Sequence, residues 1–122
     1  MFINVQIPVN GQDPRAIASA LWALWAANMV QMRPDYPSVY AFARYEREPL
    51  GREQWQTADQ LLRTRVGDCE DLASYQVAWL KVTGRDPHAK IAIKRSSVGY
   101  HVVVKRGDGS IEDPSASLGM WG

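Results

Sequence analysis

The chain has a single cysteine, Cys69, and this excludes an internal disulfide. It has only two histidines, His88 and His101, so a histidine-dependent reaction would have to use one of them. The formal net charge of +1 gives no electrostatic reason to expect nucleic acid or a membrane as a partner. A reactive thiol does best in a reducing compartment. Because residues 1–9 also predict no export signal, we expect a protein that acts in the cytoplasm or leaves it with a larger assembly.

Long apolar runs and export signals are also missing. The most apolar stretch, residues 16–30, is 15 residues long and contains Ser19 and Asn28, so it is too short to cross a bilayer. Residues 1–9 have no basic start followed by an apolar core, so they do not predict a signal peptide. With 46% hydrophobic and 22% charged residues, the composition is typical of one globular domain spanning residues 1–122.

The first part of the chain predicts helices. Asp13–Pro14 is a good helix start, and Arg33–Pro34 would end this helix near Met32. The helix is apolar on nearly all sides, so we expect it to be enclosed by protein or by a partner. A weakly alternating segment at 39–45 predicts a strand or extended chain, and helical spacing predicts a second helix over 55–63.

The last part of the chain predicts consecutive strands. Alternating or β-branched residues between turn signals place strands at 2–7, 89–95, 100–105 and 110–113, before an irregular tail. Helices that precede a set of hairpin-connected strands form an α+β pattern. We therefore expect N-terminal helices that pack on a small antiparallel sheet.

The sequence around Cys69 predicts the start of another helix. Asp68 is a good N-cap, and an apolar-periodic run follows as far as Gly84. In the first turn, the helix dipole and free amides favour a thiolate and can stabilise an oxyanion. A lone cysteine is more often a buried small hydrophobe, but the acids Asp68, Glu70 and Asp71 argue against that role. They would raise the thiol pKa unless a base or a cation offsets them.

The base that we predict is His101, which lies inside a predicted strand. If residues 107–109 form a three-residue loop, His101 and Asp113 share one face of the sheet as diagonal neighbours, roughly 7–8 Å apart. A bend near Pro114 would then bring the carboxylate to the ring, whereas a two-residue loop would place the two residues on opposite faces. A lone histidine is more often structural, and we expect His88, in a loop, to be solvated.

Cys69, His101 and Asp113 together have the parts of a catalytic triad. His101 would take the thiol proton and later protonate the leaving group, while Asp113 would fix the tautomer of the ring. The cysteine and the histidine are 32 residues apart, and the histidine and the aspartate are 12 apart.

These motifs resemble those of the transglutaminase-like cysteine peptidase superfamily. The Gly-Asp-Cys-Glu-Asp form is similar to the bacterial transglutaminase-like cysteine proteinase branch and to small phage proteins encoded near virion genes. An upstream Trp-x-Thr segment is also similar. The matching segments, within residues 45–120, are Trp55–Thr57, Gly67–Ala73, Tyr100–Val104 and Ile111–Pro114.

The resemblance implies a papain-like and transglutaminase-like core, in which the Cys69 helix packs on a sheet bearing His101 and Asp113. It implies a thiol peptidase, amidase or acyl transferase that acts on a protein or peptide substrate. A phage-encoded member would act in the host cytoplasm or the virion, with possible virion or assembly proteins as partners. Gln56 or Trp55 would be a side-chain oxyanion donor. The rival interpretation is a non-catalytic virion structural or binding module.

The resemblance also raises the question of calcium. In the bacterial proteinase branch, acidic residues beside the cysteine bind calcium, and Asp68, Glu70 and Asp71 match those positions. The fourth ligand of that branch, an asparagine, has no evident counterpart, although Asp86 or His88 lies near its expected place. Helix capping and the helix dipole explain the same acids, and we therefore predict no metal and no cofactor.

Overall fold

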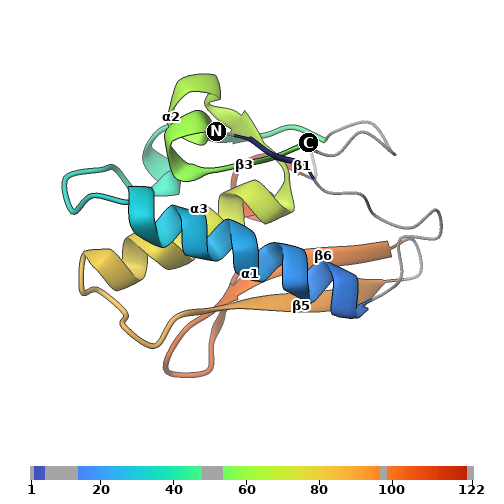
Figure 1. Ribbon diagram of the computed structural model, residues 1–122. Helices are drawn as coiled ribbons and strands as arrows, with labels where there is room; N and C mark the ends of the chain where they lie inside the picture. The colour runs from blue at the N-terminus through green and yellow to red at the C-terminus, as the bar shows by residue number, and fades with distance from the viewer. Residues whose placement is uncertain (1, 5–13, 48–53, 97–98, 121–122) are drawn as a thin grey trace.

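The computed structural model describes residues 2–4, 14–47, 54–96 and 99–120 (Figure 1). Its helices are α1 (Pro14–Gln31), α2 (Ala58–Thr64), α3 (Cys69–Val82) and α4 (Pro114–Ser117), with a 3-10 helix at Val39–Ala41. Its strands are β1 (Phe2–Asn4), β2 (Arg44–Tyr45), β3 (Gln54–Gln56), β4 (Val66–Gly67), β5 (Lys90–Ser96), β6 (Gly99–Lys105) and β7 (Ile111–Glu112). The predicted α+β class is confirmed. None of the described helices combines the length and the apolar character that crossing a membrane would require.

The strands form three small sheets. The largest has the order β5-β6-β7, with antiparallel neighbours, as the hairpin pattern predicted. The pair β1-β3 is antiparallel and the pair β2-β4 is parallel. Strand β7 is shorter than the predicted segment 110–113, because it has only two residues, and β1 is described over Phe2–Asn4. Residues 5–7 of the predicted first strand and Asp13 lie outside the described residues.

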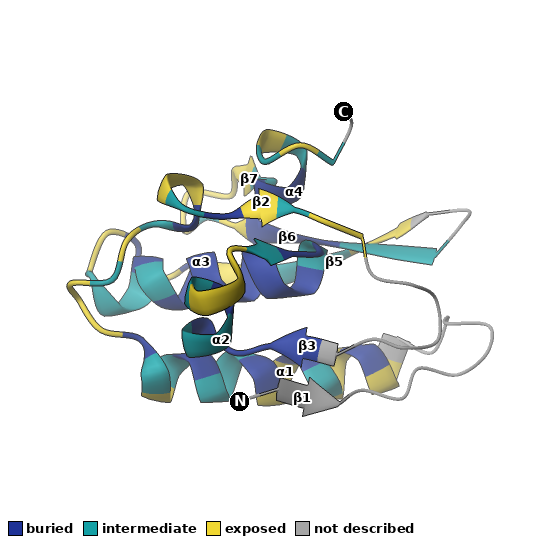
Figure 2. Cartoon of the chain, turned by 90° about the horizontal axis from the view of Figure 1, so that it is seen from above, coloured by how far each residue is buried: buried dark blue, intermediate teal, exposed yellow. Residues whose placement is uncertain are grey.

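Helix α3 is the centre of the molecule. Figure 2 shows it between α1 on one side and β6 and α4 on the other, and ten of its 14 residues are buried. Its apolar side chains join two core clusters, one with α1 and β6 and one with α2 and the 3-10 helix. The first residue of α3 is therefore held by packing on several sides.

A buried amide on α1 fixes the three longer helices relative to one another. The Asn28 amide nitrogen donates to Ser74 Oγ on α3 at 2.8 Å, and its carbonyl oxygen accepts from the N–H of Ala58 at 2.7 Å. Gln31 accepts in the same way from Asp59, at 3.0 Å. The side chains of α1 thus satisfy free N–H groups at the start of α2. A polar residue that interrupts the apolar run in the sequence is a tertiary link in the fold.

Two of the predicted elements differ from the structure. Segment 39–45 is a 3-10 helix followed by the two-residue strand β2, rather than one extended strand. The second helix is confirmed from Ala58, with Thr57 as its N-cap, but residues 54–56, where the helical spacing begins, form strand β3. Helical spacing at 55 misled the prediction, because pairing with β1 and bonds to α3 hold this segment extended.

Helix α1 spans the predicted residues but is enclosed on one side only. Ile17, Leu21 and Leu24 are buried in the core. Trp22 and Val30 on the outer side are 67% and 87% exposed. The expectation that protein encloses the helix is therefore wrong for the described part of this chain, and its outer face is left to solvent or to a partner.

Candidate active site

Cys69 lies where the sequence predicts it, at the first residue of α3. Asp68 is the N-cap, with extended backbone at φ −95° and ψ −169°. The backbone N–H of Val102, on strand β6, hydrogen-bonds the cysteine sulfur. The only thiol of the chain therefore lies against β6, one residue beyond His101.

His101 and Asp113 form a hydrogen-bonded pair, with Nε2 of the ring 2.9 Å from Oδ2 of the carboxylate. The pairing follows from the loop between β6 and β7. The N–H of Arg106 donates to the carbonyl of Ser110 at 2.8 Å, and Gly109 has φ of +90°. This is the three-residue loop that puts both side chains on one face of the sheet. The prediction that His101 and Asp113 share one face of the sheet is confirmed.

Asp113 uses its two carboxylate oxygens differently. Oδ2 contacts His101, whereas Oδ1 accepts the N–H of Ala116 at 3.2 Å and caps α4. Pro114 is the first residue of α4, so the chain turns sharply after β7. The predicted irregular tail is wrong at this point, because aspartate followed by proline is also a helix start. The bend expected near Pro114 is this helix.

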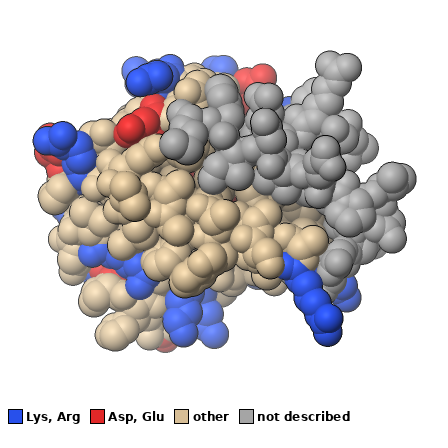
Figure 3. Space-filling view, in the orientation of Figure 1, with Lys and Arg blue, Asp and Glu red and all other residues tan. Residues whose placement is uncertain are grey.

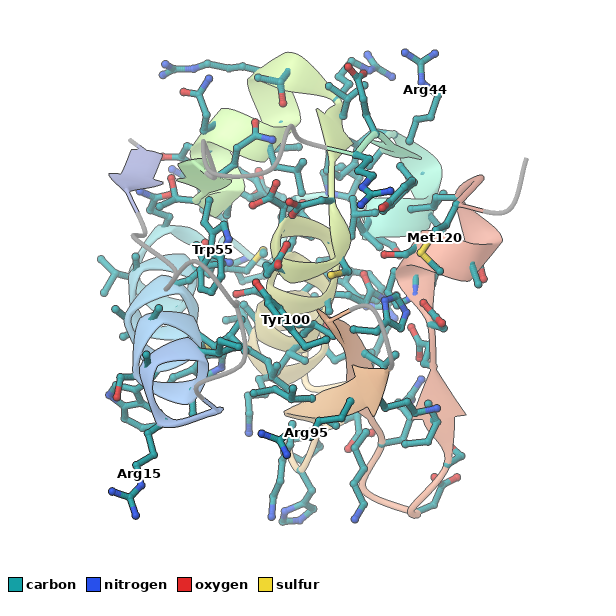
Figure 4. All side chains as sticks on the ribbon, turned by 90° about the vertical axis from the view of Figure 1, so that its right-hand side faces the viewer. Arg15, Arg44, Trp55, Arg95, Tyr100 and Met120 are labelled. Atoms are coloured by element: carbon teal, nitrogen blue, oxygen red, sulfur yellow. The ribbon has the colours of Figure 1, made fainter. Side chains whose placement is uncertain are left out.

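The docking of α3 onto β6 uses a part of the strand that β7 does not cover. The backbone N–H of Arg106 donates across the loop to Ser110, toward β7. The backbone N–H groups of alternate residues in a strand point in the same direction, so the N–H of Val102 also points away from β5. Strand β7 pairs only with Val104 and Lys105, which leaves that N–H for the Cys69 sulfur. Figure 4 looks onto the near end of α3, where Tyr100 lies between Trp55 and Met120.

The surroundings raise the pKa of the Cys69 thiol well above its ordinary value. Burial is the largest cause, and the negative charges of Glu70 and then Asp68 add to it. The N–H of Val102 acts in the opposite direction. The prediction that the neighbouring acids raise the thiol pKa is therefore confirmed, and the expected thiolate at the helix start is not favoured in the resting protein. The thiol needs a base.

The acids of the cysteine motif are engaged locally. Glu70 is only 3% exposed, and its Oε1 accepts the hydroxyl of Tyr100 at 2.5 Å. Asp71 is fully buried and accepts the N–H groups of Gln56 at 2.7 Å and Asp68 at 3.3 Å. Burial is the main cause that raises the pKa of Asp71, to about 8. Asp71 therefore closes the start of α3 onto β3, and Tyr100 is a contact that its position beside His101 could have suggested.

The two expected oxyanion donors have different outcomes. The Gln56 amide nitrogen donates to the carbonyl of Val66 at 2.7 Å and to Asp71 at 3.3 Å, so both of its hydrogens are used. The prediction for Gln56 is therefore wrong in this conformation. Trp55 is fully buried in the core cluster that α1 and β6 share, and its role stays a prediction.

The residues that calcium would need are only partly occupied by hydrogen bonds, since the second oxygen of Glu70 is buried with no hydrogen-bond partner among the described residues. The carboxylate of Asp71 is surrounded by N–H donors, and one oxygen of Glu70 is bonded to Tyr100. Asp86 pairs with Arg106 at 2.7 Å, and His88 is exposed in the same turn. In the described ranges, no three side chains of histidine, cysteine, aspartate or glutamate form a group that could hold a metal ion. The prediction of no metal stays a prediction.

Comparison with known proteins adds no relative, since no protein-family model, no curated protein and no solved structure matches this chain. The contacts of Cys69, His101 and Asp113 are therefore the basis for any functional conclusion.

Proposed function

We propose that this chain is a thiol peptidase or amidase, or an acyl transferase, with a transglutaminase-like and papain-like core. The observation that carries the proposal is the 2.9 Å contact between His101 and Asp113, on the strand against which Cys69 lies. A nucleophile at a helix start, an imidazole and a carboxylate that orients it are the three roles of a cysteine triad.

The reaction would begin with the protonated thiol. A carboxylate can only accept a hydrogen bond, so Nε2 of His101 carries hydrogen toward Asp113 and Nδ1 is left as the basic nitrogen. Nδ1 takes the thiol proton as Cys69 Sγ attacks the amide carbonyl carbon. The oxyanion is stabilised by the backbone N–H of Cys69 at the start of α3.

The tetrahedral intermediate then collapses. The C–N bond breaks, the imidazolium of His101 gives its proton to the leaving amine, and an acyl-thioester remains on Cys69. Water completes hydrolysis, or a primary amine completes acyl transfer, with His101 again as the base. In both cases the thiol is regenerated with its proton.

A substrate-independent experiment tests the base assignment. Iodoacetamide alkylation of Cys69 is followed by intact mass at several pH values in the parent protein, His101→Ala and His88→Ala. We expect His101→Ala to slow alkylation at neutral pH by about tenfold or more, because general-base help is worth about a hundredfold or more in enzymes. His88→Ala is the matched control and is expected to leave the rate unchanged. Equal rates in all three proteins would refute the assignment.

Turnover is tested separately, with casein as the amide substrate and a fluorescent primary amine as the acceptor. We expect hydrolysis or amine incorporation by the parent protein and none by Cys69→Ala. Turnover that survives Cys69→Ala would remove the nucleophile from the proposal.

One observation favours a second candidate, a non-catalytic binding module that keeps the fold. The thiol pKa is raised rather than lowered, as in buried structural cysteines. Such a module would show slow alkylation that does not depend on His101, so the same experiment separates the two functions.

A further inference from the structure

Strand β5 is the free edge of the main sheet. The sheet order is β5-β6-β7, so in the described part of the chain no strand pairs with the outer side of β5. Figure 1 shows β5 as the lower of the two long strands, with β6 and α1 above it in this view. At seven residues it is as long as β6. A long free edge is a template for pairing with another strand.

The outward-pointing backbone groups of β5 can be assigned. The backbone N–H of Arg106 donates toward β7. The backbone N–H and C=O groups of the even-numbered residues of β6 therefore point to β7, and those of the odd-numbered residues point to β5. The β5 partners of those odd residues are Lys90, Ala92 and Lys94. Ile91 and Ile93 therefore point their N–H and C=O groups outward, where no backbone partner is found among the described residues.

An apolar cavity of about 390 Å³ lies beside this edge. We call it the α1–β5 groove, and its main lining side chains are Leu21, Trp22, Trp25, Val77, Ile91 and Ile93. The rings of Trp22 and Trp25 are 4.8 Å apart, and Trp22 is 67% exposed. A volume of this size accommodates a few apolar side chains of a partner.

The charge around the groove has one sign. Among the residues that the structure describes, Lys81 and Lys90 are the charged side chains that line it, and β5 also carries Lys94 and Arg95 but no acidic residue. Figure 3 shows this face of the molecule, where uncharged atoms form a broad band whose lower edge carries mainly lysine and arginine side chains, with small acidic patches at the lower left and the bottom. An occupant with acidic side chains would complement this rim.

We propose that the β5 edge and the α1–β5 groove together bind an extended, acidic segment of a partner protein by strand addition. The segment would pair with the outward groups of Ile91 and Ile93, and its alternate apolar side chains would enter the groove. A second copy of this chain is disfavoured, because two β5 strands would place Lys90, Lys94 and Arg95 against like charges. Cys69 lies on the other side of β6, so this surface is independent of the proposed chemistry.

The test uses a labelled synthetic peptide that alternates leucine or valine with glutamate, and fluorescence anisotropy as the measure of binding. The control peptide has lysine in place of glutamate and is expected to bind at least about tenfold more weakly. Trp22→Ala is expected to weaken binding of the acidic peptide by about tenfold, because it removes an exposed aromatic wall. Val30→Ala is the matched control, since Val30 is exposed on the same helix but does not line the groove.

Amide hydrogen exchange by NMR tests the pairing itself. We expect the acidic peptide to slow exchange at Ile91 and Ile93, while Ala92, which already bonds β6, changes little. No binding, unchanged exchange at the two isoleucines, or equal binding of the lysine peptide or by Trp22→Ala would each overturn the proposal. Protection of the same amides by dimerisation of the free protein would also overturn it and assign the edge to a second copy.

Discussion

Asp113 makes two separate contacts, because one carboxylate oxygen contacts His101 and the other caps helix α4. Asparagine keeps the capping oxygen but loses the charge that holds the ring. We expect Asp113→Asn to lower turnover by about a hundredfold or more, while thermal unfolding changes little.

Asp113→Ala is the comparison, because it removes both contacts. It is expected to lose turnover as well and to cost about 1 kcal/mol in the free energy of unfolding, measured with denaturant. If Asp113→Asn unfolds as easily as Asp113→Ala, the cap at α4 contributes nothing, and the loss of activity could not be attributed to the ring contact.

Among the acids near Cys69, Glu70 raises the pKa of the thiol most. Its negative charge follows burial as a cause of the raised pKa of Cys69. A neutral glutamine can still accept the Tyr100 hydroxyl, so Glu70→Gln is expected to lower the thiol pKa. Alkylation at neutral pH should then be faster, and the pH at which the rate is half-maximal should move down.

The matched control for Glu70→Gln is Asp35→Asn, which removes an exposed acid whose side chain is 76% accessible. It is expected to leave the alkylation profile in place. An unchanged profile in Glu70→Gln would mean that burial alone sets the thiol pKa.

At the scale of elements, the β6–β7 loop sets the register that brings Asp113 to His101. Gly109 closes this loop with φ of +90°, a backbone conformation that residues with a side chain rarely adopt. Its N–H donates to the Arg106 carbonyl at 2.9 Å. We expect Gly109→Ala to destabilise the fold by about 1 kcal/mol, measured by denaturant unfolding. Gly109→Asn should cost less, because asparagine tolerates the left-handed region. Equal stability of all three proteins would contradict this account of the loop.

At the scale of the whole molecule, Asp71 and one oxygen of Glu70 at the start of α3 accept hydrogen bonds from β3, Asp68 and Tyr100. We therefore expect a chelator to leave the melting temperature unchanged. A bound calcium ion would instead add about 2.7 kcal/mol at a hundredfold excess over its dissociation constant, which is several degrees for a domain of this size. A drop of several degrees with chelator, reversed by calcium and not by magnesium, would contradict the prediction.

The sequence alone determined the parts of the site that follow local rules. Asp68 before an apolar-periodic run placed Cys69 at the first residue of a helix, and capping preferences are properties of a few adjacent residues. Two glycines around Asp108 gave the loop length, and the two-residue period of a strand then put His101 and Asp113 on one face. The α+β class followed from the order of the elements in the same way.

The tertiary structure decided whatever depends on residues far apart in the chain. The pKa of Cys69 is set by burial under elements that the local sequence does not reveal. Gln56 is not an oxyanion donor, because Asp71 and Val66 take its hydrogens, and the same bonds hold residues 54–56 extended against their helical spacing. Long-range hydrogen bonds and desolvation outweigh local propensity at such positions. The free edge of β5 is likewise visible only once the strand order is known.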